Sequence, residues 1–221
     1  LEREGSLRDR ELQITRPDGV VRTVLDTWYI NRDPSDSELI FHGILVDITS
    51  RKALEDQLVE QSIRDPLTGC YNRRHLAALY ASRTDPDAMW GCIYVDIDHF
   101  KQYNDIHGHA AGDSVLVKMS RFLMRYVRAE EAVVRMGGDE FLITLFDTGL
   151  KATEAIARRL EAAGQERGPV SFSLGWAARE GIETLEETVN RADRELIQVR
   201  VVSRPGSYTR RTPPELLTES A

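Results

Sequence analysis

The chain has 221 residues, 41% of them apolar, and a formal net charge of -7 at pH 7. This length and apolar content suffice for one well-packed core and part of a second. The negative charge argues against broad attraction to nucleic acid or to an acidic membrane surface, so an anionic substrate must be held by local cations. We therefore expect no nucleic-acid partner and no membrane contact from this fragment.

Cysteine use and hydropathy indicate a reducing, cytoplasmic location. The two cysteines, Cys70 and Cys92, lack the spacing of metal ligands or of a disulfide framework. No apolar run approaches the length of a membrane span, and no basic-then-apolar leader opens the chain. Because the chain begins at Leu1, we treat it as a fragment whose full-length form could be attached to a membrane upstream.

The first 48 residues predict an antiparallel β portion. Strands are expected over 12–15, 20–30 and 39–48. The segments Arg16-Pro17-Asp18-Gly19, His42-Gly43-Ile44 and Asp47-Ile48-Thr49-Ser50-Arg51-Lys52 resemble the C-terminal half of a PAS sensor domain. A generic β-meander is the alternative.

A helix is expected over 49–63, with Leu54 and Leu58 on one stripe. It fits a short paired signalling helix or a single solvated connector, because it holds too few heptads to assert a coiled coil. The segment Asp65-Pro66-Leu67-Thr68-Gly69 then ends the helix and starts a new domain.

The second domain reads as mixed α/β. A helix over 72–80 precedes an apolar run, Cys92-Ile93-Tyr94-Val95, typical of a buried central strand, and Asp96 and Asp98 follow that run. Residues 101–113 read as a polar, glycine-punctuated connection into a helix. The buried face of that helix is formed by apolar residues, namely Val115, Leu116, Met119, Phe122, Leu123 and Tyr126. Beyond the hairpin described next, we expect a helix over 150–163, a strand over 170–177 and a helix over 185–200.

Residues 133–145 predict a β-hairpin with a chemically active tip, Gly137-Gly138-Asp139-Glu140. The two glycines supply no side-chain bulk, so a phosphate could lie against the main chain. Carboxylates at such a place would repel phosphate unless a hard cation such as Mg²⁺ bridges the two. An ordinary glycine-rich turn with solvated acids is the alternative for this stretch alone.

Five motifs occur in a specific order. They are Asp65-Pro66-Leu67-Thr68-Gly69, Asp96-Ile97-Asp98-His99-Phe100-Lys101, Asn104-Asp105 with Gly108-His109, Gly112-Asp113 and Gly137-Gly138-Asp139-Glu140-Phe141. In this combination the chain resembles the GGDEF diguanylate cyclases over about residues 63–205. The resemblance implies an α+β fold in which helices flank a central mixed sheet. It also implies condensation of two GTP molecules into cyclic di-GMP with release of two pyrophosphates, by a Mg²⁺-dependent homodimer; Mn²⁺ is a possible substitute.

The resulting domain plan has four parts: 1–48 a partial PAS domain, 49–63 a signalling helix, 64–205 a GGDEF domain and 206–221 an irregular tail. We expect the PAS portion and the helix to set the pairing of two cyclase domains.

The resemblance also assigns a metal site. Asp96, the backbone carbonyl of Ile97, Asp139 and Glu140 would hold Mg²⁺, and Asp139 and Glu140 are the candidate catalytic acids. This agrees with the chemistry, since attack of a ribose 3′-hydroxyl on an α-phosphorus needs a polarised phosphate and a lowered hydroxyl pKa, and metal ions supply both.

Nucleotide-binding residues follow from the same resemblance. Asn104 and Asp113 would hold the guanine edge, because an amide and a carboxylate match its donors and acceptors. His109 would line the nucleotide site, and Lys101 would approach the β- or γ-phosphate. For His109 and Lys101, local loop structure and a solvated cation are the alternatives.

Near its C-terminus the chain departs from the family pattern of Ala-Asp, Leu-Tyr, Ala-Lys and Gly-Arg-Asn. It has Ala192-Asp193, Leu196-Ile197, Val199-Arg200 and Ser203-Arg204-Pro205 instead. Arg200 stands at the phosphate-binding lysine and Arg204 at the family arginine, so charge is kept while shape changes.

A product-inhibition site is also implied. Arg128 and Glu131 stand where the family has Arg-x-x-Asp, with an acid one methylene longer, and Arg159 matches a second arginine that some members use.

Two other functions compete with an active cyclase. One is a catalytically silent module that binds GTP or cyclic di-GMP as a signalling receptor, because the segment 196–205 is altered. The other, a different nucleotide cyclase or polymerase-like palm, is disfavoured because the guanine-type pair and the hairpin motif are both present.

Overall fold

The computed structural model describes residues 6–32, 39–82, 85, 87–128 and 131–203. The chain divides into two compact units, residues 1–62 and 63–221. The finer plan of a PAS portion, a signalling helix and a tail stays a prediction, and the tail 206–221 lies outside the described residues.

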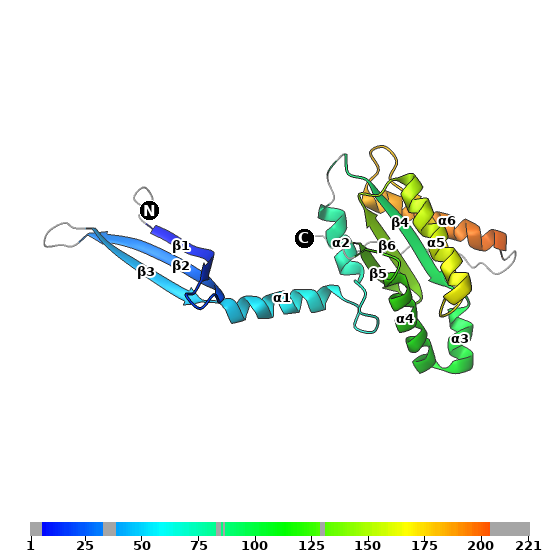
Figure 1. Ribbon diagram of the computed structural model, residues 1–221, viewed down its shortest axis with the longest axis horizontal. Helices are drawn as coiled ribbons and strands as arrows, with labels where there is room; N and C mark the ends of the chain where they lie inside the picture. Colours follow the sequence, from blue (N-terminus) through cyan, green and yellow to red (C-terminus); the bar gives the residue numbers. More distant parts are fainter. Residues whose placement is uncertain (1–5, 33–38, 83–84, 86, 129–130, 204–221) are drawn as a thin grey trace, which may run out of the picture. The chain divides into compact units, whose positions relative to one another are not determined.

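The N-terminal unit contains a three-stranded antiparallel sheet in the order β1-β2-β3 (Figure 1). Its strands are β1 (Ser6–Thr15), β2 (Val21–Arg32) and β3 (Leu39–Asp47). Asp18 accepts a hydrogen bond from the Val20 amide at 3.1 Å, and Gly19 has φ 81°, so the residues between β1 and β2 form a tight turn. The three predicted strands are present, and helix α1 (Thr49–Ile63) follows them.

Helix α1 has no buried residue, and Leu54 and Leu58 are 57% and 56% exposed. The choice between a paired and a solvated helix therefore stays open.

The second unit is built on a four-stranded sheet in the order β5-β6-β4-β7. Its strands are β4 (Trp90–Ile97), β5 (Ala132–Gly137), β6 (Glu140–Phe146) and β7 (Phe172–Ala178). These strands pair antiparallel, and the parallel pairing among the described residues is the isolated bridge between Tyr71 and Val134. The predicted mixed α/β fold is confirmed, with a sheet more antiparallel than expected.

Helices cover both faces of this sheet (Figure 1). They are α2 (Arg73–Ser82), α3 (Phe100–His107), α4 (His109–Met124), α5 (Leu150–Arg167) and α6 (Leu185–Ser203). Residues of β4 alternate between the faces, as a pleated strand requires. Ile93 and Val95 join the core under α4 and α5, whereas Cys92 and Tyr94 join the core under α2 and α6. All eight residues of β4 are buried, as predicted for a central strand.

Close packing of α6 on β7 depends on Gly175. A Cβ there would lie 2.1 Å from the Leu196 backbone nitrogen and 2.4 Å from the Ala192 carbonyl oxygen. Any side chain would therefore push the helix away from the sheet. The last turns of α6, with Arg200, are held close to the sheet in this way.

One predicted connection was wrong. Residues 100–107 form helix α3, where the polar composition indicated an irregular segment. Phe100 and Tyr103 pack against the core from an otherwise polar helix, and Gly108, at φ 82°, separates α3 from α4. The third apolar residue of α3, Ile106, is 75% exposed, and three apolar residues in so short a polar stretch are too weak a pattern to predict a helix.

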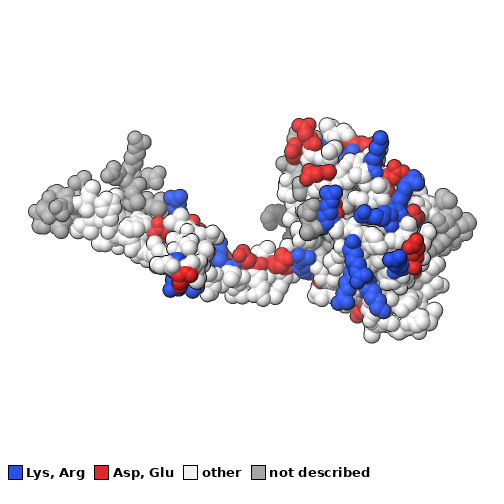
Figure 2. Space-filling view, viewed as in Figure 1, with Lys and Arg blue, Asp and Glu red and all other residues white. Residues whose placement is uncertain are grey.

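No helix in the described ranges is long and apolar enough to cross a membrane. Figure 2 shows arginine and lysine side chains of the second unit in small groups, with acidic and uncharged surface between them on the face drawn. Positive charge on that face is therefore local.

Candidate functional site

The register between β4 and β6 brings the predicted metal ligands to one end of the sheet. Asp96 lies opposite Glu140 in that register, and the Ile97 amide donates a hydrogen bond to the Asp139 carbonyl at 3.3 Å. Gly137 and Gly138 form the hairpin turn with φ 151° and 53°, a backbone that favours glycine. The sheet itself therefore holds these acids beside a turn without side chains.

Arg200 reaches this end of the sheet from α6. Its guanidinium donates one hydrogen bond to Asp96 Oδ2 at 2.7 Å and a second, from Nη2, to Asp96 Oδ1. Its Nη2 also lies 3.8 Å from Asp98 Oδ1. The sequence placed Arg200 on a phosphate, and here it forms a two-pronged ion pair with a predicted metal ligand.

Asp98 is held separately from Asp96. Its carboxylate accepts hydrogen bonds from Ser171 Oγ at 2.6 Å and Ser173 Oγ at 2.8 Å. Its amide donates to the Ser171 carbonyl at 2.9 Å. Asp98 therefore joins the end of β4 to Ser171 and to Ser173 of β7, which is a structural role.

The electrostatics of Asp96 indicate a site that requires positive charge. Burial raises the pKa of its carboxyl from the ordinary 3.8 to about 7, against the hydrogen bonds and charge of Arg200, which lower it. The nearby carboxylates of Asp139 and Glu140 raise it further. Clustered like charges of this kind are stabilised by a cation.

The donor set fits a hard divalent cation by its chemistry. Three carboxylates and the Ile97 carbonyl oxygen are the kind of oxygen ligands that Mg²⁺ and Mn²⁺ prefer. Within the described ranges, however, no group of three or more His, Cys, Asp or Glu side chains is arranged to hold a metal ion. Arg200 supplies the positive charge at Asp96 in this arrangement.

The predicted guanine-binding residues lie on the α3–α4 pair. Asn104 Oδ1 is buried and accepts no hydrogen bond from the described part of the chain. A Cβ on Gly112 would lie 1.8 Å from that oxygen, so glycine at this position lets Asn104 lie against α4. Asp113 follows Gly112 and is exposed. An amide oxygen without a hydrogen-bond donor on α3 and an exposed carboxylate on α4 are the kinds of group that pair with an edge of hydrogen-bond donors.

Lys101 and His109 are exposed, at the first turns of α3 and α4 respectively. Their contacts leave the roles predicted for them untested. Arg204 lies outside the described residues.

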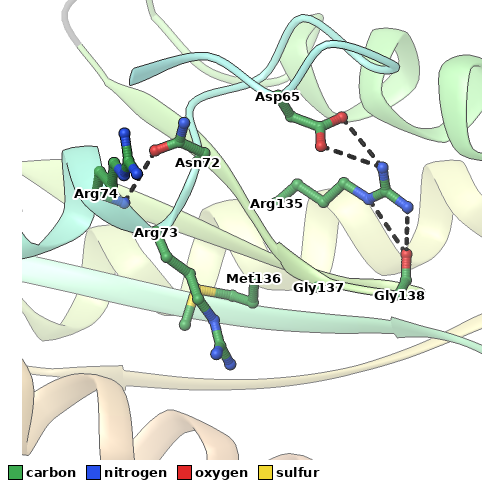
Figure 3. Close-up of a pocket in the computed structure, with 8 residues that line it drawn as sticks. All are labelled: Asp65, Asn72, Arg73, Arg74, Arg135, Met136, Gly137 and Gly138. Carbon is green, nitrogen blue, oxygen red and sulfur yellow. Dashed lines mark hydrogen bonds and ion pairs between the residues drawn. The ribbon is translucent and has the colours of Figure 1, made fainter. Parts of the chain in front are cut away.

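Arg135 is a residue of the site that the sequence reasoning missed. Figure 3 shows its guanidinium between Asp65 and the hairpin turn. Nη1 donates to both Asp65 oxygens at 3.1 and 3.2 Å, while Nε and Nη2 donate to the Gly138 carbonyl at 3.2 and 2.9 Å. Asp65 also accepts hydrogen bonds from the Thr68 amide and hydroxyl. Arg135 thus ties the start of the second unit to the glycine turn.

The contacts of Arg135 with Asp65 and Gly138 border a pocket of about 420 Å³. Figure 3 labels the residues that line this pocket. The sequence signal that could have identified these contacts is an arginine shortly before the two glycines, together with the acid that opens the Asp65-Pro66-Leu67-Thr68-Gly69 motif. Nothing in their spacing shows that they meet.

The three predicted product-inhibition residues lie on connected segments. Glu131 is 7% exposed and accepts a hydrogen bond from the Arg128 amide at 2.6 Å, while the Arg128 side chain is exposed. Arg159 Nη2 donates to the Tyr126 carbonyl at 3.0 Å. Arg159 therefore contacts the segment that carries Arg128, whereas Glu131 turns its carboxylate toward the backbone. Ligand binding by these residues stays a prediction.

Comparison with known proteins identifies relatives of the second unit. Over 172 residues the chain is 34% identical to diguanylate cyclase DgcM of Escherichia coli K12, an alignment that covers 71% of this chain and 40% of DgcM. A crystal structure of diguanylate cyclase SiaD from Pseudomonas aeruginosa, in complex with its activator SiaC, superimposes with a TM-score of 0.60 at 33% identity. That match covers 70% of this chain and 64% of SiaD.

The fold is also that of the coiled coil and GGDEF domain of DgcB from Caulobacter crescentus, solved in complex with c-di-GMP. Its TM-score is 0.63 at 24% identity, over 70% of this chain and 88% of that one. Residues 62–204 match the family described as "Diguanylate cyclase, GGDEF domain". Since this match covers more than half of the chain, the chain belongs to the GGDEF diguanylate cyclase family.

Proposed function

We propose that the chain is an active diguanylate cyclase that condenses two GTP molecules into cyclic di-GMP and releases two pyrophosphates. The observation that carries the proposal is the register that sets Asp96 opposite Glu140 and beside Asp139, next to a turn of two glycines. This places acidic oxygen donors where a phosphate can lie against bare backbone. The match to DgcM and SiaD supports the same reading for a chain that spans less than half of DgcM.

The residues of the chain have distinct tasks in this proposal. Bound Mg²⁺, or Mn²⁺ in its place, would polarise the α-phosphate and lower the pKa of the attacking 3′-hydroxyl. Asp96, the Ile97 carbonyl, Asp139 and Glu140 would hold the cation, and Asp139 is our candidate for accepting the hydroxyl proton. The glycine turn would leave space for the phosphates.

Nucleotide orientation would come from the α3–α4 pair and from basic side chains. The buried Asn104 oxygen would accept a hydrogen bond from guanine, and the Asp113 carboxylate would accept from N1 and N2. Lys101 and Arg200, with Arg204, would neutralise the β- and γ-phosphates. We assign His109 to the lining of the same site.

The reaction implies a homodimer. Each site would hold one GTP, and two sites must face each other before both new phosphodiester bonds can form. We propose that the N-terminal sheet is part of a PAS sensor domain which, with α1, controls this pairing. The exposed Leu54 and Leu58 supply α1 with an apolar stripe for a second copy. We also retain Arg128, Glu131 and Arg159 as a site for product inhibition.

A second function, a silent GGDEF module that binds GTP or cyclic di-GMP as a receptor, is favoured by one observation. Arg200, in the altered C-terminal segment, forms a two-pronged ion pair with Asp96. If that pair never opened, the metal ligand would stay blocked and binding could occur without turnover.

Incubation with GTP and Mg²⁺ over a range of protein concentrations separates the two functions. A dimeric cyclase makes cyclic di-GMP at a rate that rises faster than linearly with protein, and Asp139→Ala abolishes it. GTP binding without product at every concentration, even when dimerisation is forced through a fused coiled coil, would establish the receptor instead.

A further inference from the structure

We propose that Arg200 occupies the metal's place on Asp96 in the metal-free protein and moves to a nucleotide phosphate when the metal binds, so that metal and nucleotide bind as a coupled pair. This inference rests on the proposed function, because it deepens the role of the same metal and nucleotide site.

The contacts of Arg200 explain why it competes with a metal. Its two terminal nitrogens engage both oxygens of the Asp96 carboxylate. The Arg200 and Asp96 side chains are 20% and 7% exposed, so water screens their attraction weakly. A divalent cation can take an oxygen of Asp96 only by displacing one of these charge-assisted hydrogen bonds.

The other contacts of Arg200 in the described part of the chain do not hold its side chain strongly, so it can leave Asp96. Its Nη2 stands 3.8 Å from Asp98, and the two Asp98 oxygens already accept hydrogen bonds from Ser171 and Ser173. Asp98 is therefore a poor alternative partner. Arg200 also lies in the last turn of α6, where a long side chain can swing with little change of the backbone.

The Arg200 Nε supplies an independent observation. It is buried and donates no hydrogen bond to the described part of the chain. A guanidinium has five N–H donors, and its fork matches phosphate geometry as well as carboxylate geometry. A phosphate group, with more acceptor oxygens than a carboxylate, can satisfy the donor that Asp96 leaves unpaired.

The two movements then support each other. Transfer of Arg200 to a nucleotide phosphate uncovers Asp96 beside Asp139 and Glu140, which leaves three carboxylates with no cation on Asp96. A divalent cation neutralises that cluster, and the neutralised carboxylates then no longer attract Arg200 back. Metal and nucleotide would each raise the affinity of the site for the other by the same factor.

Lysine at this position would behave differently. Its ammonium is a point charge on a flexible stem and cannot engage both carboxylate oxygens with a planar fork. The substitution Arg200→Lys should therefore keep the positive charge near Asp96 while weakening the competition with a metal.

The test measures Mn²⁺ binding to the whole 221-residue chain by electron paramagnetic resonance of free Mn²⁺, with and without a non-hydrolysable GTP analogue. Without nucleotide, we expect Arg200→Gln to bind Mn²⁺ about tenfold more tightly than wild type, the effect of one charge-assisted hydrogen bond that the metal need not displace. Arg200→Lys should fall between the two. The analogue should tighten Mn²⁺ binding to wild type by more than it does for Arg200→Gln.

Two controls define the site. Arg194→Gln removes the same charge from an exposed position of the same helix, and should leave Mn²⁺ affinity within about twofold of wild type because exposed charges are screened. Asp96→Asn should remove the tight Mn²⁺ site. Thermal melting of each variant without metal shows that it is folded.

Equal Mn²⁺ affinity of folded Arg200→Gln and wild type, or an equal gain from Arg194→Gln, would overturn the coupling. Formation of cyclic di-GMP by such a protein would leave the proposed function standing. Conversely, the expected Mn²⁺ shifts in a protein that makes no product would support the coupling and refute the cyclase.

Discussion

Replacing Gly112 with alanine would force Asn104 out of its present place. The added Cβ would lie 1.8 Å from Asn104 Oδ1 and 2.9 Å from its Cγ, both too close for the amide to stay. The backbone fixes the direction of a Cβ, so the new methyl group cannot turn away from Asn104 while α4 keeps its place. The substitution thus removes the unpaired acceptor without altering Asn104 itself.

The expected cost falls on guanine binding more than on stability. Alanine stabilises a helix interior by about 1 kcal/mol relative to glycine, while overpacking costs about 1–3 kcal/mol, so the two effects largely offset each other. Losing one hydrogen bond to guanine should weaken GTP binding by about tenfold.

Calorimetric titration with a non-hydrolysable GTP analogue measures this loss. The corresponding inosine nucleotide, which lacks the 2-amino group, should still bind the Gly112→Ala variant more weakly than the guanine nucleotide does, because Asp113 would keep its contact with N2. Ser114→Ala, at an exposed position of the same helix, is the control for helix propensity and should bind like wild type.

A double-mutant cycle decides whether Asn104 is the cause. If Gly112→Ala acts through Asn104, it should add almost nothing to the loss already caused by Asn104→Ala. Additive losses, or unchanged GTP affinity in a folded Gly112→Ala protein, would refute the assignment of Asn104 to guanine.

Three further predictions concern other parts of the second unit. Arg135→Ala should lower the free energy of unfolding by about 2 kcal/mol, because the Gly138 carbonyl and the partly buried Asp65 carboxylate lose charge-assisted hydrogen bonds. Arg135→Lys should recover only part of this free energy. Chemical denaturation measures both changes. The folded-state pKa of Asp96 is raised to about 7, so the folded protein binds the extra proton and the stability of the metal-free protein should fall as pH rises from about 4 to 7. Melting temperatures measured from pH 5 to 8 should fall up to about pH 7 and then level off, and Asp96→Asn should flatten this fall. An equally steep fall in that variant would assign it to other groups. Excess cyclic di-GMP should lower the initial rate, and Arg128→Ala, at an exposed side chain, should raise the product concentration for half inhibition by about tenfold, whereas unchanged inhibition would contradict the site.

The sequence predicted best what local patterns determine. The alternation of apolar residues and the paired glycines predicted the hairpin of β5 and β6, and the continuous apolar run predicted the buried strand β4. Strand register then brought Asp96 close to Asp139 and Glu140. Helix α3 escaped prediction because only Phe100 and Tyr103 anchor it to the core.

Contacts between residues far apart in the chain could not be read from the sequence. Arg135 and Asp65 are 70 positions apart, and Arg200 and Asp96 are 104 apart. The family resemblance assigned Arg200 to a phosphate of the bound nucleotide. It does not predict which residue the Arg200 side chain contacts when no nucleotide is bound. The inward turn of Glu131 is a local contact, three positions along the chain, and it escaped prediction for another reason: its partner is a backbone amide that any sequence would supply.

Arg200 also links the two functions that compete for this chain. A lysine would neutralise Asp96 as a point charge that a metal can displace readily, whereas the arginine fork engages both carboxylate oxygens. The chain can therefore work as a cyclase only if the metal and a nucleotide phosphate together displace Arg200 from Asp96. If they do not, nucleotide binding leaves Asp96 blocked and the domain is a receptor. Through Arg200, the altered segment 196–205 determines how strongly metal binding depends on bound nucleotide. The Mn²⁺ titration with and without a GTP analogue therefore bears on both functions.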